Sequence, residues 1–166
     1  CSTGSAFVIH TLTTKSGFKI SGETKSTTLP TGSGAGYDPH FCSKCGTFVW
    51  CEYHVAPKGF VVLRTGTLDK PNNIHPQAHI FTTQKLPWLS LPKDVPSFPE
   101  MYNRTETWPK ASNQIMDRLV ANATSNTWPL DLSAVLNFWG NAIVLIEHLE
   151  MSTSHPRNLS HHLDVA

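Results

Sequence analysis

The alternation of apolar and polar positions in the first part of the chain is typical of β-strands. Apolar runs or alternating positions predict strands over residues 7–14, 18–20, 47–50 and 60–63. The last two are also dense in β-branched and aromatic residues, which favour strands. Glycine-rich residues 31–36 and the Asp-Lys-Pro-Asn-Asn segment at 69–73 predict a loop and a turn. We therefore expect residues 1–102 to form a mainly β domain.

A proline-rich stretch closes this half of the chain. Residues 86–99 carry four prolines, at positions 87, 92, 96 and 99. Because proline fixes φ and lacks an N–H, the stretch predicts an extended, irregular path without helix. We interpret Trp88 within it as an anchor of the core or of a lid.

From about residue 103 the spacing of apolar residues becomes helical. Two segments, 111–123 and 131–150, place apolar residues three and four positions apart and predict two helices. Residues from about 151 onward predict a loose tail. We accordingly divide the chain into a β domain, residues 1–102, and a partly helical extension of unknown role, residues 103–166.

Composition and charge narrow the classes of function. The chain has 166 residues with a formal net charge of +1, and 15% of them are charged. This balance argues against an electrostatically driven nucleic-acid binder. No uncharged apolar run reaches the length of a membrane span, so we also expect no membrane partner.

The sharpest chemical signal is the segment Cys42-Ser43-Lys44-Cys45-Gly46. Two thiolates spaced C-x-x-C at a tight turn can converge on one metal ion, and a following glycine permits a positive φ. A redox pair and two unreactive thiols are the alternatives. One C-x-x-C supplies two of the four ligands that tetrahedral zinc takes, so the spacing alone leaves these alternatives open.

Other candidate ligands are weaker. Cys51 lies on an apolar run and is better explained as a small core residue, and His40 as a solvated or core-edge histidine. His10, His54 and His79 have no spacing that indicates a shared site. Four cysteines, three of them bunched, do not form the framework of a disulfide-rich fold.

Several short segments, in order, resemble the glutathione-dependent formaldehyde-activating enzyme family, which includes centromere protein V-like domains. The resemblance covers residues 1 to about 100. Its segments are Cys1-Ser2-Thr3-Gly4-Ser5-Ala6-Phe7, His40-Phe41-Cys42-Ser43-Lys44-Cys45-Gly46-Thr47, Gly66-Thr67-Leu68-Asp69, Pro76, His79-Ile80-Phe81 and Pro87-Trp88-Leu89.

The resemblance implies a β-tent fold, similar to that of Mss4-like proteins, with zinc bound by cysteines. Cys42 and Cys45 would belong to a structural zinc site, and Cys1 would be the last thiolate of a catalytic Cys-x-Cys-x-x-Cys site. The implied activity is that of a carbon–sulfur lyase that joins formaldehyde to the thiol of glutathione to give S-hydroxymethylglutathione. Zinc would lower the pKa of that thiol and could polarise the aldehyde oxygen.

The sequence departs from the family pattern at its start. The early Cys-x-Cys and two of the three catalytic cysteines are missing, so we expect the β-tent to be truncated at its N-terminus, in a fragment or in a gene model that lost its first exon. Because each lost thiolate removes charge neutralisation and chelate closure, we expect weak zinc binding and impaired catalysis by these residues alone.

Two functions from different classes follow. The first is a zinc-dependent lyase acting on a glutathione–aldehyde adduct, and the alternative is a non-catalytic zinc-binding β-tent module that binds glutathione or a protein partner. Lys44 or Arg64 could meet the carboxylates of the implied substrate, but exposed basic residues are common and we assign neither to the site. Free-thiol chemistry of this kind favours the reducing cytoplasm.

Overall fold

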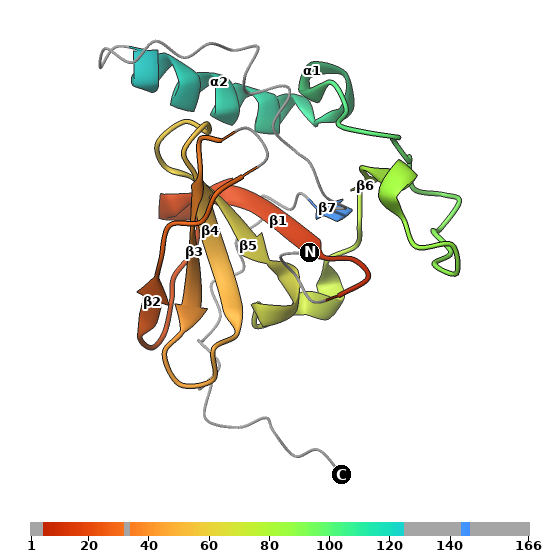
Figure 1. Ribbon diagram of the computed structural model, residues 1–166. Coiled ribbons are helices and arrows are strands. Elements are labelled where there is room, and N and C mark those ends of the chain that lie inside the picture. The colour runs from red at the N-terminus through yellow and green to blue at the C-terminus, as the bar shows by residue number, and fades with distance from the viewer. Residues whose placement is uncertain (1–4, 32–33, 125–143, 147–166) are drawn as a thin grey trace.

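One mixed sheet organises the part of the chain that the computed structural model describes, residues 5–31, 34–124 and 144–146 (Figure 1). Its strand order is β2-β3-β4-β5-β1-β7-β6. The strands are β1 (Ile9–Thr14), β2 (Thr24–Ser26), β3 (Tyr37–Cys42), β4 (Phe48–Tyr53), β5 (Phe60–Arg64), β6 (Ala78–His79) and β7 (Val144–Ile146). The first five strands pair antiparallel with one another, and β1 pairs parallel with β7. The prediction of a mainly β chain is confirmed.

The centre of the sheet is β5, between β4 and β1. Val61 and Val62 are fully buried, on opposite faces, as a continuous apolar run flanked by two strands requires. The strands expected over residues 47–50 and 60–63 are therefore confirmed as β4 and β5, and most of the stretch expected over 7–14 forms β1.

A hydrophobic cluster lies on each face of the sheet. The larger cluster contains Leu12, Cys51, Phe60 and Val62, together with Tyr102 from the chain that leads into the helices. The smaller cluster, on the other face, is built on Trp50, Val61 and Leu63. The alternation of side chains along β4 and β5 thus fills both cores.

Two helices follow the proline-rich stretch: α1 (Arg104–Thr107) and α2 (Lys110–Thr124). Figure 1 shows α2 lying across the end of the sheet away from the turn between β3 and β4. Met116 and Leu119 pack against the larger cluster from α2. The helix expected over residues 111–123 is confirmed, and its apolar spacing reflects this contact.

The second expected helix is wrong where the structure describes it. Residues 144–146 form β7, which joins β1 and β6, whereas the remainder of the 131–150 segment and the tail from 151 lie outside the described residues. A short apolar run fits a buried strand and a helix equally well, and pairing with the open edge of β1 decides between them. β7 thus brings a strand from the 103–166 segment into the sheet of residues 1–102.

Two further expectations differ from the structure. Residues 18–20 form no strand, because they follow a 3₁₀ turn at Lys15–Gly17 and Phe18 instead packs edge-on against Trp50. Trp88 is 69% exposed and anchors no core. Trp88 lies in a turn from Leu86 to Leu89, in which the Leu89 N–H donates to the Leu86 carbonyl at 3.0 Å. Residues 86–99 contain no helix, as their prolines predict.

No helix within the described ranges is long and apolar enough to cross a membrane.

Candidate functional site

The C-x-x-C segment forms a tight turn between β3 and β4, here called the cysteine turn (residues 42–47). The Cys42 N–H donates to the Thr47 carbonyl at 2.8 Å, and the Gly46 N–H donates to the Cys42 carbonyl at 2.9 Å. Gly46 has a φ of 73°, in the left-handed region that an L side chain rarely adopts. The glycine therefore lets the chain reverse directly after Cys45, as its place in the sequence predicts.

The turn brings its two thiols into different surroundings. Cys42 is buried and Cys45 is exposed, and both are free. The Thr47 hydroxyl lies 3.2 Å from Cys45 Sγ and, together with the Thr47 N–H and then the Cys42 thiol, lowers the pKa of Cys45. Hydrogen bonds to sulfur stabilise the thiolate, so Cys45 is the more nucleophilic and the more metal-competent thiol of the pair.

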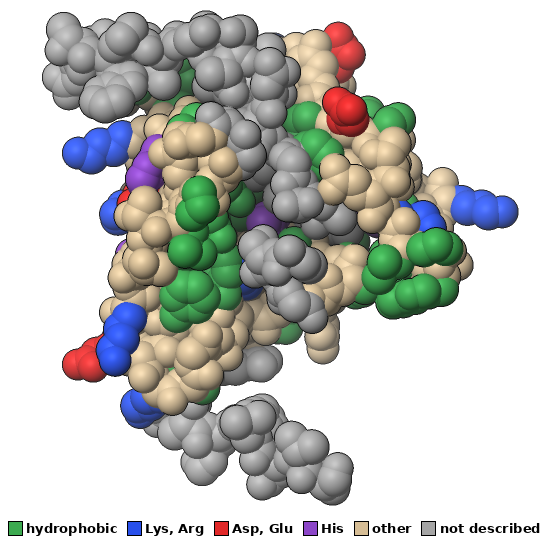
Figure 2. All heavy atoms as spheres, in the orientation of Figure 1, with side chains coloured by type: hydrophobic (Ala, Val, Ile, Leu, Met, Phe, Trp, Pro, Cys, Tyr) green, Lys and Arg blue, Asp and Glu red, His purple; other side chains and the backbone are tan. Residues whose placement is uncertain are grey.

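The residues that begin β4 and end β5 lie beside the cysteine turn. Phe48 follows the turn directly, and its ring contacts that of Phe41 at a centroid distance of 5.3 Å. The guanidinium carbon of Arg64, the last residue of β5, lies 3.9 Å from the centroid of the Phe48 ring. Figure 2 shows hydrophobic side chains gathered over β3 and β4 on this side of the molecule. The guanidinium of Arg64 thus lies on the ring of Phe48, and only β4 separates the strand of Arg64 from that of Cys42.

Arg64 is held from its other side by a histidine of β1. Arg64 Nη1 donates to His10 Nε2 at 2.6 Å, and these two residues are paired across the β1–β5 ladder. Burial, and then the charge of Arg64, lower the pKa of His10 well below its usual value. His10 is therefore neutral, with its lone pair on Nε2 and its proton on Nδ1, which has no partner within the described residues.

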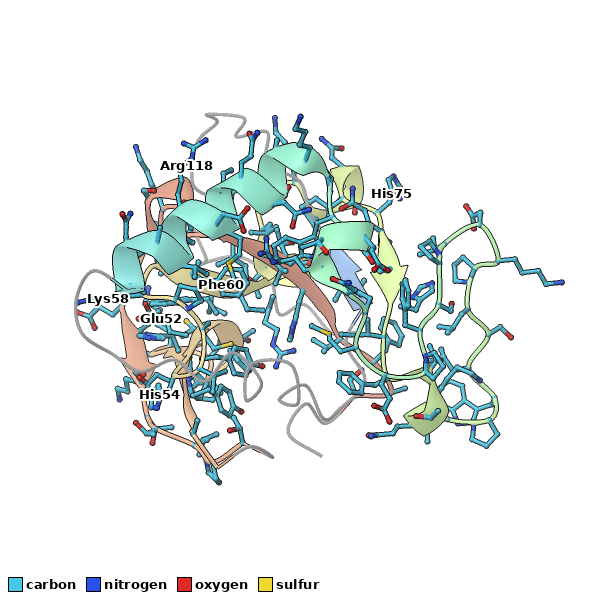
Figure 3. The ribbon with its side chains drawn as sticks, turned by 90° about the horizontal axis from the view of Figure 1, so that it is seen from above. Glu52, His54, Lys58, Phe60, His75 and Arg118 are labelled. Atoms are coloured by element: carbon cyan, nitrogen blue, oxygen red, sulfur yellow. The ribbon has the colours of Figure 1, made fainter. Side chains whose placement is uncertain are left out.

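The other histidines that the structure describes lie in separate surroundings. His40 stacks on Trp50 at 3.6 Å, and burial lowers its pKa, which fits the expectation of a core-edge histidine. His79 is buried with both ring nitrogens unpartnered within the described residues, and burial lowers its pKa as well. His54 and His75 lie well apart (Figure 3).

A comparison with protein-family models shows to which family the chain belongs. The model of the glutathione-dependent formaldehyde-activating enzyme family matches residues 1–84, just over half of the 166-residue chain. The chain belongs to this family. The match includes β1 to β6 and the cysteine turn. Neither the curated proteins nor the solved structures yielded a match.

The formaldehyde-activating family implies zinc, and the cysteine turn fits half of a zinc site. Cys42 and Cys45 supply two thiols on one turn, whereas four-coordinate zinc requires two more ligands. No group of three or more His, Cys, Asp or Glu residues suited to a metal occurs in the described part of the chain. Cys1, predicted as a ligand of a second, catalytic site, lies outside the described residues. The described side chains by themselves therefore do not complete a zinc site.

Cys51 is a core residue, as its place on an apolar run predicts. Its side chain is 1% exposed, and burial raises the pKa of its thiol to about 12. It lies in the larger cluster and pairs with Val62 across the β4–β5 ladder. At neutral pH this thiol is neither a nucleophile nor a ready metal ligand.

One polar cluster was not foreseen from the sequence. His54 Nε2 lies 2.9 Å from Asp38 Oδ2, and His54 Nδ1 lies 2.9 Å from the Ala35 carbonyl. The other Asp38 oxygen accepts from the Thr28 hydroxyl at 2.7 Å. No motif or regular spacing connects these residues in the sequence. The β3–β4 pairing brings His54 to Asp38, and the bridge between Leu29 and Tyr37 brings Thr28 there.

Proposed function

We propose that the protein catalyses the joining of formaldehyde to the thiol of glutathione and the reverse cleavage of the S-hydroxymethyl adduct. Membership of the glutathione-dependent formaldehyde-activating enzyme family is the observation that carries this proposal. Support also comes from the cysteine turn, whose two free thiols lie beside an aromatic surface with a cation on it.

The proposed reaction is an addition to a carbonyl group. The sulfur of the glutathione thiolate attacks the carbon of formaldehyde, so a C–S bond forms and the carbonyl π pair moves to oxygen. That oxygen then takes a proton and becomes the hydroxyl of S-hydroxymethylglutathione. Cleavage runs the same steps backwards, which places the activity among the carbon–sulfur lyases.

We propose that Cys42 and Cys45 act as zinc ligands and that Cys1 contributes to a second, catalytic site. A bound zinc would favour the thiolate form of glutathione. Because the described ligands cover half of a tetrahedral site, we expect weak zinc binding by this chain. A dialysed sample that retains less than one zinc per chain fits this expectation, and tight stoichiometric zinc contradicts it. We also propose a cytoplasmic location, because free-thiol chemistry of this kind requires a reducing compartment.

Magnetisation-exchange NMR between glutathione and its formaldehyde adduct tests the proposed activity. Zinc-loaded protein should accelerate exchange above the spontaneous rate, and Cys45→Ser should reduce that acceleration. Cys51→Ala is the matched control, since Cys51 is buried in the core and away from solvent. Exchange at the spontaneous rate in the zinc-loaded protein would reject the lyase function and favour the non-catalytic binding module.

A further inference from the structure

Among the described residues, Arg64 has no acidic partner. The ion pairs formed among the described residues are Lys15–Glu52, His54–Asp38 and Arg104–Asp117, and none includes Arg64. Burial lowers the pKa of the Arg64 guanidinium. The nearby Cys51, Tyr53 and Tyr37 have raised pKa values, so at neutral pH they supply no negative charge to it. A partly buried guanidinium is normally paired with an anion. The described surroundings of Arg64 therefore leave its charge unbalanced and open to an anionic ligand.

The side chain is also held ready for such an anion. The Phe48 ring covers one face of the guanidinium, and His10 Nε2 accepts one of its N–H groups. Because His10 is neutral, it fixes the guanidinium without neutralising its charge. The remaining N–H groups have the planar fork geometry that carboxylates accept in pairs.

The distance to the cysteine turn suits a peptide-sized ligand. Arg64 ends β5, two strands from Cys42 at the end of β3, and Phe48 connects the two positions. Neighbouring strands are roughly 4.8 Å apart, so the separation is on the order of 10 Å. A tripeptide also spans on the order of 10 Å. A glutathione-sized ligand lying on the Phe48 surface beside the cysteine turn could therefore place a carboxylate at Arg64.

We propose that Arg64, positioned by Phe48 and His10, binds a carboxylate of the glutathione moiety. This assignment rests on the proposed function and extends it by naming the residue that selects an acidic thiol. Arg64 acts in binding, His10 and Phe48 act by positioning it, and the thiol of the ligand is left free to react.

The test measures glutathione affinity for the full chain by NMR, with the Nε–Hε signal of Arg64 as the local readout. Arg64→Gln should weaken binding by about tenfold or more, as expected for a lost charge-assisted contact. Arg64→Lys should bind with intermediate affinity, because it keeps the charge and loses the fork. Lys58→Gln is the matched control, since Lys58 is exposed at the other end of β5, near α2 (Figure 3).

A second arm varies the ligand and needs no variant, so a folding defect in Arg64→Gln cannot obscure the result. Wild-type protein should bind glutathione about tenfold or more tightly than its diethyl ester, in which both carboxylates are masked. Only glutathione should shift the Arg64 signal. Equal affinity for the two ligands, or an unmoved Arg64 signal in the bound state, overturns the assignment.

The outcomes also separate this assignment from the proposed function. If glutathione binds through Arg64 but exchange with formaldehyde stays at the spontaneous rate, the assignment stands and the lyase function fails. Alternatively, exchange is accelerated while Arg64→Gln binds glutathione as tightly as wild type does, and wild type binds the ester as tightly as glutathione. In that case the lyase function stands and the assignment fails. No glutathione binding by wild-type protein rejects the assignment.

Discussion

At the scale of single residues, three cysteines of one sequence region differ in chemistry because their burial differs. Cys45 is exposed and hydrogen-bonded, Cys42 is buried at the end of a strand, and Cys51 is enclosed in the core. The same thiol group is consequently thiolate-prone in the cysteine turn and inert nine residues beyond Cys42. The hydrogen bonds of the cysteine turn therefore make Cys45 reactive.

The contribution of Thr47 to Cys45 can be measured by alkylation. Thr47→Val removes the hydroxyl that lies 3.2 Å from Cys45 Sγ, so the pKa of Cys45 should rise and its thiolate fraction at pH 7.5 should fall. We expect a few-fold slower reaction with iodoacetamide in metal-free protein, followed by mass spectrometry. Trypsin cleaves after Lys44 and so reports Cys42 and Cys45 in separate peptides.

Thr47→Ser is the control for this change, because it keeps the hydroxyl and should react at the wild-type rate. Cys51 should stay unmodified in all three proteins until denaturant is added, since it is buried with a pKa of about 12. Equal rates for Thr47→Val and wild type would show that the Thr47 hydroxyl does not contribute to the reactivity of Cys45.

At the scale of elements, the Asp38–His54 pair connects β3 to the turn that follows β4. Both ring nitrogens of His54 face acceptors, so the protonated ring is favoured, and Asp38 raises the pKa of His54. Hydrogen bonds from Thr28 and His54 lower the pKa of Asp38 in turn. The pair therefore contributes most when the carboxylate and the imidazolium coexist.

The pH dependence of this pair follows from the raised pKa of His54 and the lowered pKa of Asp38. The contribution of His54 is complete below its ordinary pKa of 6.5 and is lost as pH rises through its higher folded-state pKa. The contribution of Asp38 is complete above its ordinary pKa of 3.8 and is lost as pH falls through its lower folded-state pKa. Both contributions are therefore present between about pH 4 and pH 6.5.

Asp38→Asn tests the pair. In urea denaturation at pH 5.5 the variant should lose about 0.2–1 kcal/mol of unfolding free energy, the range of a solvent-exposed pair, and at pH 9 the loss should shrink. An NMR titration should show the pKa of His54 moving down toward 6.5. Glu52→Gln, which removes a half-buried carboxylate paired with Lys15, should leave the titration of His54 unchanged. A deficit that is the same at both pH values would contradict the ion-pair explanation.

The sequence predicts local elements well and long-range pairing poorly. The Phe60–Leu63 run and the helical spacing of 111–123 each carry enough periodicity to identify β5 and α2. The sequence did not predict β3, because Pro39 interrupts its alternation of apolar and polar residues. In the structure Pro39 is buried and pairs with Cys51 of β4. For the site, the C-x-x-C-G spacing predicts the cysteine turn. The contact of Arg64 with His10 joins residues 54 positions apart, and no local pattern encodes it.

At the scale of the whole molecule, the sheet depends on both ends of the described chain. β7, from the C-terminal part, pairs with β1 on one side and β6 on the other. Without β7, the N–H and C=O groups on one edge of β1 would lose their partners. The segment after residue 103 therefore contributes to the stability of the β sheet.

Truncation tests this dependence. Removing residues 125–166 deletes β7, and we expect a lower Tm and concentration-dependent aggregation, measured by thermal denaturation and light scattering. Removing only residues 151–166, the predicted tail, is the control and should leave both properties near those of the full chain. An unchanged Tm after the longer truncation would show that β7 adds no stability.

The pairing of Ile9 with Val144 also bears on how the protein forms in the cell. During synthesis β1 leaves the ribosome long before β7, so an edge of the central sheet stays open while most of the chain is translated. Contacts between such distant residues carry a large loop-closure entropy and slow folding. The nascent chain thus passes through a stage in which β1 can pair with other chains, and we expect its yield to depend on chaperones that cover open strands.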